Sequence, residues 1–455
     1  MNDISTLLAG LALVTTTFAG GVAAYEGREL DAPWRAEAEQ RIAEHRRGPL
    51  TIRVIDADGN PLAGVPVRVE QTQHDFGFGS AIDSYLYLFG SPRHPEMGGL
   101  YRQLAEDVFR FNEVVFEGDM KQKTWNQYKQ GDHRNNQLSF LDATLTRLEQ
   151  RGVRVRGHYL IQGMVMWGNN RWGFTDYRAE FDADRSTLEE RLIAEAAERA
   201  EYFGDRVVDW DVINHTAGWY RNWAWRNRTG EPDFGVEWVK RLRKVVPEHV
   251  EFYFNEGNIL SSNGDRADAY FEVTTAHLDG GAPIDGVGFM GHFKVDSKSG
   301  EFDTGPLTPP ARQYEIMDRF ANLGLDLKVT EFDVDAGTDE QLQADFLRDS
   351  MIVAFSHPSM KAFVMWGFWE AKHWRPAAAL TRRDGSIKPA GQAYLDLVFD
   401  AWWTDEEVAT SSEGTIEILA FYGDYTLTAT VDGKPVVLEL THTRDAPADA
   451  VLQAE

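Results

Sequence analysis

The stretch from Val207 to His215 reads VVDWDVINH, a run of apolar and β-branched residues that ends in polar side chains. Runs of this kind recur from residue 76 onward and alternate with longer segments of helical spacing. The predicted strands are Phe76–Ala81, Glu113–Phe116, Val153–Leu160, Val207–Asn214, Glu251–Asn255, Asp285–Phe289, Asp326–Phe332 and Ala362–Trp366. Eight βα units with near-continuous apolar strands predict a fold of the α/β class, a parallel sheet closed into a (β/α)8 TIM barrel.

The helices expected between and after these strands lie around residues 100–110, 139–151, 186–203, 235–246, 265–278, 311–322, 339–355 and 390–402. The alternative architecture is an open, doubly wound sheet. No Gly-x-Gly-x-x-Gly fingerprint follows the first strand, so the sequence favours the barrel.

Both flanks of the barrel show β patterns. A helical segment at Trp34–Arg47 precedes two alternating stretches, Leu50–Ile55 and Val65–Glu70. After the barrel, strands are predicted at Thr415–Phe421, Tyr425–Val431 and Val436–Thr441, and the tail from Arg444 has the composition of a disordered end. We therefore predict a signal peptide or N-terminal anchor at 1–24, a small N-terminal helix and β unit at 25–75, the barrel at 76–403 and a C-terminal β module at 404–455.

Composition narrows the function classes. The 46 Lys and Arg against 72 Asp and Glu give a formal net charge of −26, which disfavours nucleic acid and anionic membranes as partners. The absence of cysteine excludes disulfides and thiolate chemistry, and no cofactor is predicted. Residues 7–24 are apolar and end in Val-Ala-Ala, which predicts a signal peptide and a secreted or periplasmic protein. No Lys or Arg precedes that stretch, so an uncleaved anchor is the alternative.

Polar and aromatic side chains stand where the predicted strands end, which is where TIM barrels carry their catalytic groups. These residues are Glu117, Asp119, Lys121, His158, Asn214, His215, Asn255, Glu256, His292, Glu331, Asp333 and Trp366. Carboxylates, imidazoles and amides that bind hydroxyl groups, together with tryptophans that stack on pyranose rings, form the composition of a sugar site. We therefore expect a sugar ligand at this rim of the barrel.

Over about residues 76 to 400 the sequence resembles glycoside hydrolase family 10, the β-1,4-xylanases. Seven segments match the family in order: Phe76-Gly77-Phe78-Gly79, Phe111-Asn112 through Glu117 to Lys121, Arg156-Gly157-His158, Trp210 to Asn214, Asp285 to Gly288 with His292, Val329 to Asp333, and Trp366-Gly367 with Trp374 and Lys388-Pro389-Ala390. The β unit at 50–70 resembles the junction found in plant-like members.

The resemblance implies a polysaccharide or oligosaccharide as the partner and a role for each matching residue. Glu331 is implied as the nucleophile, hydrogen-bonded to His292, and Asn214 as the group that holds the sugar 2-hydroxyl. The remaining residues implied to bind substrate are Glu117, Lys121, His158, Trp366 and Trp374. For Glu331, the alternative is a buried acid that merely pairs with His292.

The sequence departs from the family at the centre of the site. His215 stands where the family has the acid/base glutamate, and Gly118, Gln162, Met290 and Gly257 replace asparagine, tryptophan, glutamine and tyrosine. The resemblance therefore implies that Gln162 alters the wall of the central substrate-binding subsite relative to the family.

Three interpretations follow from His215. It acts as the general acid, because an imidazolium beside the Glu331 carboxylate keeps its proton near neutral pH. Alternatively the site has lost turnover and binds glycan only. In the third, His158, His215, His292 and Glu331 converge on a metal ion, as three imidazoles and a carboxylate can.

The tract from Gly218 to Arg228 holds three tryptophans and three arginines. It either stacks on sugars and pairs with uronic acids, together with Arg375, Arg382 and Arg383, or packs as a loop whose arginines meet surface acids.

Overall fold

The protein is described here by a computed structural model that covers residues 24–89, 99–130, 138–164, 176–218, 225–231, 233–298, 304–445 and 449–454. The predicted signal peptide lies outside these residues, apart from its last position. Among the helices of the described ranges, none is long and apolar enough to cross a membrane.

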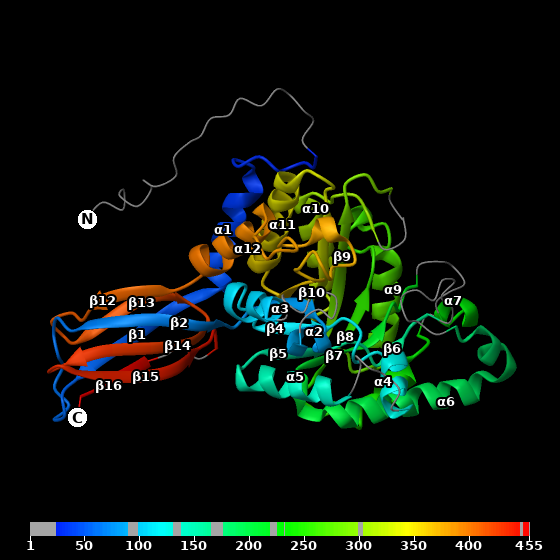
Figure 1. Ribbon diagram of the computed structural model, residues 1–455, viewed down its shortest axis with the longest axis horizontal. Helices are drawn as coiled ribbons and strands as arrows, with labels where there is room; N and C mark the ends of the chain where they lie inside the picture. The colour runs from blue at the N-terminus through cyan, green and yellow to red at the C-terminus, as the bar shows by residue number, and fades with distance from the viewer. Residues whose placement is uncertain are drawn as a thin grey trace.

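A closed parallel barrel forms the larger part of the molecule (Figure 1). Its strands are β3 (Gly77–Ile82), β4 (Glu113–Phe116), β5 (Arg154–Gly157), β7 (Asp209–Asn214), β8 (Glu251–Glu256), β9 (Gly286–Lys294), β10 (Asp326–Asp335) and β11 (Met360–Met365). They are hydrogen-bonded in the order β5-β4-β3-β11-β10-β9-β8-β7, and pairing of β5 with β7 closes the ring. The two-residue strand β6 (Ile161–Gln162) continues β5 along β7. The predicted (β/α)8 barrel is therefore confirmed.

Helices surround the barrel because their apolar faces pack on strands that are buried over almost their whole length. The helices are α2 (Ser84–Phe89), α3 (Leu100–Gln103), α4 (Gln122–Gln130), α5 (Leu138–Gln150), α6 (Arg178–Phe203), α7 (Trp225–Thr229), α8 (Val236–Arg243), α9 (Ala267–Asp279), α10 (Pro310–Ala321), α11 (Glu340–Ser356) and α12 (Pro389–Asp396). In α8, for example, Val236, Val239 and Leu242 are buried on one face.

A second module lies beside the barrel (Figure 1). It consists of β1 (Arg47–Ile55), β2 (Pro66–His74), β12 (Asp405–Ala409), β13 (Thr415–Phe421), β14 (Gly423–Val431), β15 (Lys434–His442) and β16 (Asp449–Gln453), and helix α1 (Pro33–His45) precedes it. One sheet has the order β13-β1-β16 and the other β12-β2-β14-β15. The β units predicted separately at the two ends of the chain thus pair into one module. A pair of strands cannot bury its apolar face alone, and here the facing sheets do so with Leu50, Val69 and Leu427.

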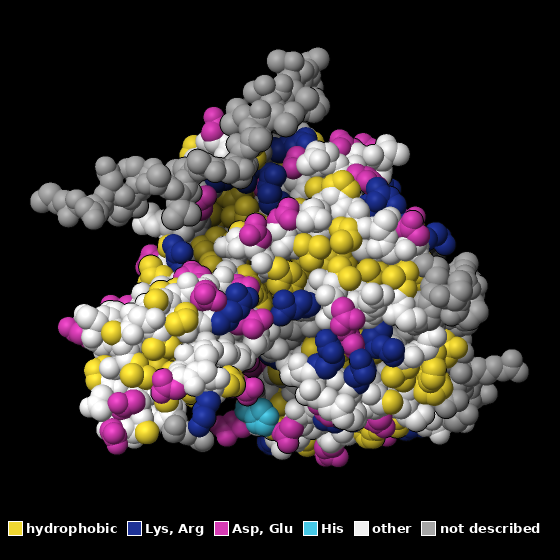
Figure 2. All heavy atoms as spheres, turned by 60° about the vertical axis from the view of Figure 1, so that its left-hand side comes forward, with side chains coloured by type: hydrophobic (Ala, Val, Ile, Leu, Met, Phe, Trp, Pro, Cys, Tyr) yellow, Lys and Arg dark blue, Asp and Glu magenta, His cyan; other side chains and the backbone are white. Residues whose placement is uncertain are grey.

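Two parts of this module differ from the prediction. Strand β12 was not expected, because its sequence DEEVA is acidic and largely exposed. The tail after Arg444 was expected to be disordered, but β16 pairs in parallel with β1 and buries Ala450 and Leu452. On the face turned forward in Figure 2, basic and acidic side chains are intermixed. Independently of that view, the module contains the ion pairs Arg53–Asp449 at 2.8 Å and Arg68–Asp405 at 2.5 Å.

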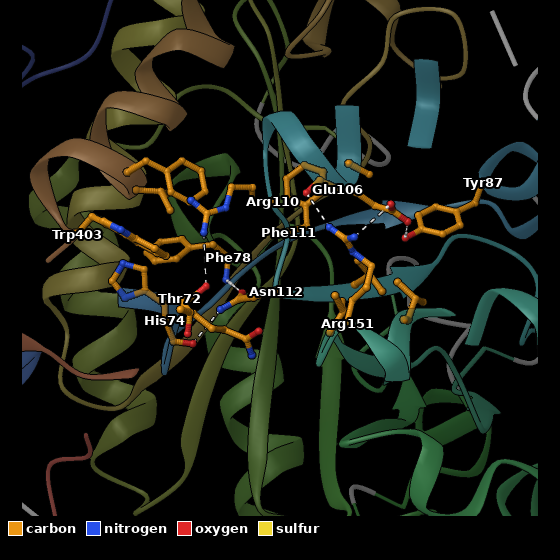
Figure 3. A pocket seen from close by; sticks show the side chains of 17 residues that line it. Thr72, His74, Phe78, Tyr87, Glu106, Arg110, Phe111, Asn112, Arg151 and Trp403 are labelled. Carbon is orange, nitrogen blue, oxygen red and sulfur yellow. Dashed lines mark hydrogen bonds and ion pairs between the residues drawn. The ribbon is translucent and has the colours of Figure 1, made fainter. Parts of the chain in front are cut away.

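A cavity of about 180 Å³ lies at the joint between module and barrel (Figure 3). Polar side chains that line the cavity make contacts with neighbouring backbone and aromatic groups. The Asn112 side-chain amide donates to the carbonyls of His74 and Phe76 at 2.9 and 3.0 Å, and the Arg110 guanidinium lies 4.8 Å from the Trp403 ring centre. These contacts tie β2 and the segment after α12 to the edge of the barrel.

Candidate active site

Glu331 lies in the second half of β10 and is buried. Its Oε1 accepts a hydrogen bond from Asn255 Nδ2 at 2.9 Å, and its Oε2 is 3.3 Å from His292 Nε2. Burial acts to raise the pKa of the Glu331 carboxyl, but the hydrogen bond from His292 and the neighbouring positive charge outweigh it, so the pKa is lowered. Glu331 is therefore an oriented carboxylate at neutral pH.

His292 lies between two carboxylates. Its Nδ1 donates to Asp333 Oδ2 at 2.8 Å, and its Nε2 faces Glu331. Burial lowers the pKa of His292, but the charges and hydrogen bonds of Asp333 and Glu331 prevail and raise it to about 9. Burial acts to raise the pKa of Asp333, but the charges of His292 and Arg375 hold it at about 2. The site therefore holds an imidazolium next to Glu331 at neutral pH.

Asp333 also positions Trp374, whose Nε1 donates to it at 2.7 Å. The Trp374 ring in turn meets the His292 ring edge-on, with ring centres 5.1 Å apart. In the sequence, Asp333 was visible as a strand-end residue, but nothing indicated its partners.

His158 follows the end of β5 and donates from Nδ1 to Asp211 Oδ2 at 2.7 Å. Asp211 also accepts from Arg156 at 2.7 Å. Burial is the largest influence on His158 and lowers its pKa, so the ring is neutral at pH 7. Its ring centre lies 5.3 Å from that of Trp366, which faces the same part of the barrel.

Amide side chains link the sugar-binding candidates to Glu331. Asn255 Nδ2 donates to Asn214 Oδ1 at 3.1 Å as well as to Glu331. Asn214 Nδ2 lies 3.5 Å from Gln162 Oε1, and Thr330 Oγ1 donates to Asn255 Oδ1 at 2.6 Å. Asn255, which the sequence marked only as a strand-end residue, therefore contacts Glu331 directly, a role that the sequence did not assign to it.

His215 follows the last residue of β7 and has a left-handed backbone, with φ of 63°. Its Nδ1 is 3.0 Å from Glu256 Oε1. Glu256 Oε2 accepts from the backbone N–H groups of Ala217 at 2.7 Å and Gly218 at 3.2 Å. His215 therefore binds the Glu256 carboxylate, a contact that the sequence interpretation did not include.

The remaining candidates for substrate binding are Glu117, Lys121, Trp366 and Trp374. Glu117, Trp366 and Trp374 line one small cavity together with Lys372. The Lys372 Nζ lies 3.4 Å from the Glu117 carboxylate, and the Lys121 Nζ lies 6.0 Å from the Trp366 ring centre. Lys372 was not predicted, because it comes from the loop after β11, far from Glu117 in sequence.

The structure brings the candidate residues to one end of the barrel, and comparison with known proteins then identifies the family. The model of glycosyl hydrolase family 10 matches residues 76–397. The chain belongs to this family.

The similarity to two curated relatives extends beyond the barrel of this chain. The anti-sigma-I factor RsgI6 of Acetivibrio thermocellus is 29% identical over 402 residues, which cover 88% of this chain and 47% of that protein. Endo-1,4-beta-xylanase 2 of Arabidopsis thaliana is 22% identical over 418 residues, 90% of this chain and 35% of that protein. The chain thus spans less than half the length of these relatives. Native xylanase 10B from Thermotoga maritima has the same barrel fold, with a TM-score of 0.56 at 20% identity over 71% of this chain and 95% of that one.

Two of the positions that the sequence analysis interpreted as departures from the family pattern, Gln162 and Met290, are buried. Met290 is 2% exposed and Gln162 is 5% exposed. Trp225 Nε1 donates to the Gln162 carbonyl at 2.9 Å, and the Trp225 ring stacks on Phe234. One tryptophan of the tract from 218 to 228 is therefore a core residue rather than a sugar platform, and residues 219–224 of that tract lie outside the described ranges.

The metal interpretation finds no support in the geometry. His158, His215 and His292 each bind a different carboxylate. Within the described ranges, no group of three or more His, Cys, Asp or Glu side chains is placed to hold a metal ion.

The arginines expected to bind uronic acids have carboxylate partners of their own. Arg375 lies 3.1 Å from Asp333, and Arg382 lies 2.7 Å from Glu340. Arg383 is 4.0 Å from Glu370, and Arg228 pairs with Asp182. The second interpretation of these arginines, pairing with the protein's own acids, fits this arrangement.

Proposed function

We propose that this family 10 barrel hydrolyses a β-1,4-linked, xylan-type polysaccharide or oligosaccharide, with Glu331 as nucleophile and His215 as acid/base. The observation that carries the proposal is the state of Glu331: it is buried, ionised and oriented by Asn255 and His292. Its curated relatives include endo-1,4-beta-xylanases, which motivates xylan as the first substrate. Cleavage of a polysaccharide also agrees with the export predicted from residues 7–24.

The chemistry would run in two steps. Glu331 attacks the anomeric carbon while the glycosidic bond breaks and His215 gives its proton to the leaving oxygen. Water then attacks the same carbon, gives a proton to His215 and releases Glu331. Asn214 would bind the sugar 2-hydroxyl, and the neutral His158 would accept from another hydroxyl.

Product release from xylan, glucuronoxylan, arabinoxylan and mixed β-glucan tests this proposal. We expect release that disappears in Glu331→Gln. For His215→Ala we expect a loss of about 10²- to 10⁴-fold on xylan, but much less on an aryl xyloside whose leaving group needs no proton. Release that survives Glu331→Gln would refute the assignment of the nucleophile. Preference for glucuronoxylan would show that a uronate is recognised despite the pairing of Arg375, Arg382 and Arg383.

The second candidate function is glycan binding without turnover. Two points favour it. The family resemblance implies that His215 stands where the family has its acid/base glutamate, and RsgI6, which is similar over 88% of this chain, is named an anti-sigma-I factor. In that case no substrate of the panel releases product, while calorimetry detects binding of xylooligosaccharides that weakens when Trp366 is replaced by Ala.

A further inference from the structure

We infer that Glu256 is a positioning residue for His215, and that the two side chains act as a pair in which Glu256 determines which ring nitrogen of His215 exchanges a proton. This inference rests on the proposed function, because it concerns the acid/base of that reaction. The inference goes beyond the proposed function because it gives a role to Glu256, a residue that never touches the substrate.

The barrel register brings the two residues together. Asn214 at the end of β7 is paired with Asn255 on β8, so the next residues, His215 and Glu256, lie side by side. The backbone N–H of His215 donates to the Asn255 carbonyl at 2.8 Å. The left-handed φ of 63° at His215, a conformation that non-glycine residues seldom adopt, turns the chain immediately after the strand.

Glu256 is held too tightly to reach a substrate itself. It is 0% exposed. Its two oxygens accept from the backbone N–H groups of Ala217, Gly218 and Gly257 at 2.7, 3.2 and 2.9 Å, in addition to His215. Burial acts to raise its pKa, but the hydrogen bond and charge of His215, with Arg266 and the Gly257 N–H, lower it. Glu256 is therefore a fixed anion.

An ionised carboxylate only accepts hydrogen bonds, so the Nδ1 of His215 has to be the protonated nitrogen of the neutral ring. Any proton that His215 gives to the glycosidic oxygen, or takes from water, then passes through Nε2. The fixed negative charge also stabilises the imidazolium from which the proton is donated. Glutamine at this position would keep the shape but would remove the charge, and its amide can donate as well as accept.

The experiment compares Glu256→Gln with Glu251→Gln, a matched change at the opposite end of the same strand. Both are assayed on xylotriose, whose leaving group needs a proton, and on an aryl xyloside with a good leaving group. For Glu256→Gln we expect a loss of kcat of at least about 10-fold on xylotriose and of less than about 2-fold for the first step on the aryl substrate. Glu256→Asp should recover part of the loss. Equal losses on both substrates indicate a structural effect and overturn the inference.

Nitrogen-15 NMR of the histidine rings provides a readout that does not require turnover. The His215 signal is assigned by its absence in His215→Gln. In the neutral ring of His215 we expect a protonated Nδ1 and an unprotonated Nε2 in the native protein, and a mixture of tautomers in Glu256→Gln. A native ring protonated on Nε2 alone would overturn the inference.

The two proposals fail in different ways. Product release that persists in Glu331→Gln, or is absent from the native protein, refutes the proposed hydrolase whatever the NMR result. Release that depends on Glu331 but is unchanged in Glu256→Gln refutes only the role of Glu256.

Discussion

Replacing Asp333 with Asn removes the carboxylate that does most to keep His292 charged. In the native protein, burial opposes the charge, yet Asp333 and Glu331 together raise the pKa of His292 from 6.5 to about 9. At about 1.4 kcal/mol per pKa unit, that rise corresponds to roughly 3 kcal/mol. About 3 kcal/mol is thus the net effect of charging His292 after burial has opposed it, and Asp333 makes the largest favourable contribution to this effect.

The pH dependence of this contribution has a definite sign. A group whose pKa is higher in the folded than in the unfolded protein stabilises the folded state fully when the pH is below its unfolded-state pKa. This stabilisation is lost as the pH rises through its folded-state pKa. For His292 it is thus complete below pH 6.5 and lost through about pH 9. Asp333 stays ionised over this range, since its own pKa is about 2.

Urea unfolding of the native protein and of Asp333→Asn at about pH 6 and about pH 10 measures the effect. We expect the difference in the free energy of unfolding to shrink by about 3 kcal/mol between the two conditions. Asp326→Asn, at the opposite end of β10 and paired with the exposed Lys361, is the control and should show a small, pH-independent difference. A difference for Asp333→Asn that is the same at both pH values would refute the idea that Asp333 keeps His292 charged.

Three further predictions concern other parts of the molecule. Leu452→Ala, in the core of the β module, should destabilise the protein by about 2–5 kcal/mol in thermal unfolding, whereas the neighbouring exposed Val451→Ala should change little. Lys328 binds Asp209 at 2.6 Å and Glu113 at 3.1 Å inside the barrel, so Lys328→Met should cost about 3–5 kcal/mol in urea unfolding, with Lys361→Met as the exposed control. Chelation with EDTA should leave product release unchanged, because each site histidine is held by its own carboxylate.

The barrel could be predicted because its strands are locally distinctive. Each is a short, nearly uninterrupted apolar run, and such runs are buried on both faces of a parallel sheet. The ends of the strands were predicted less accurately. Strand β9 was expected to end at Phe289 but runs to Lys294, because Met290 to Phe293 remain buried beyond the predicted end. Strand β12 escaped prediction, since an acidic edge strand has the composition of a loop.

Long-range pairing could not be predicted from local patterns. Nothing in the sequence of β1 shows that it pairs with β13 and β16 from the far end of the chain. The same limit applied to the site. The strand ends marked Glu256 and Asp333 as candidates, but their partners depend on the register between neighbouring strands, and the Glu117–Lys372 contact depends on a loop.

That register explains why the three site histidines share one construction. His158 binds Asp211 of β7, His215 binds Glu256 of β8, and His292 binds Asp333 of β10; in each case the acid comes from the adjacent strand and meets Nδ1. Their environments nevertheless differ.

His292 faces a second carboxylate, Glu331, and its pKa is raised to about 9, whereas Asp211 is shared with Arg156 and burial lowers the pKa of His158. The second carboxylate thus distinguishes the cationic His292 from His158, which lies beside Trp366 and whose ring burial keeps neutral. A histidine at position 215 therefore needs no new type of support: the strand next to it already supplies a fixed acid, as it does at the other two sites.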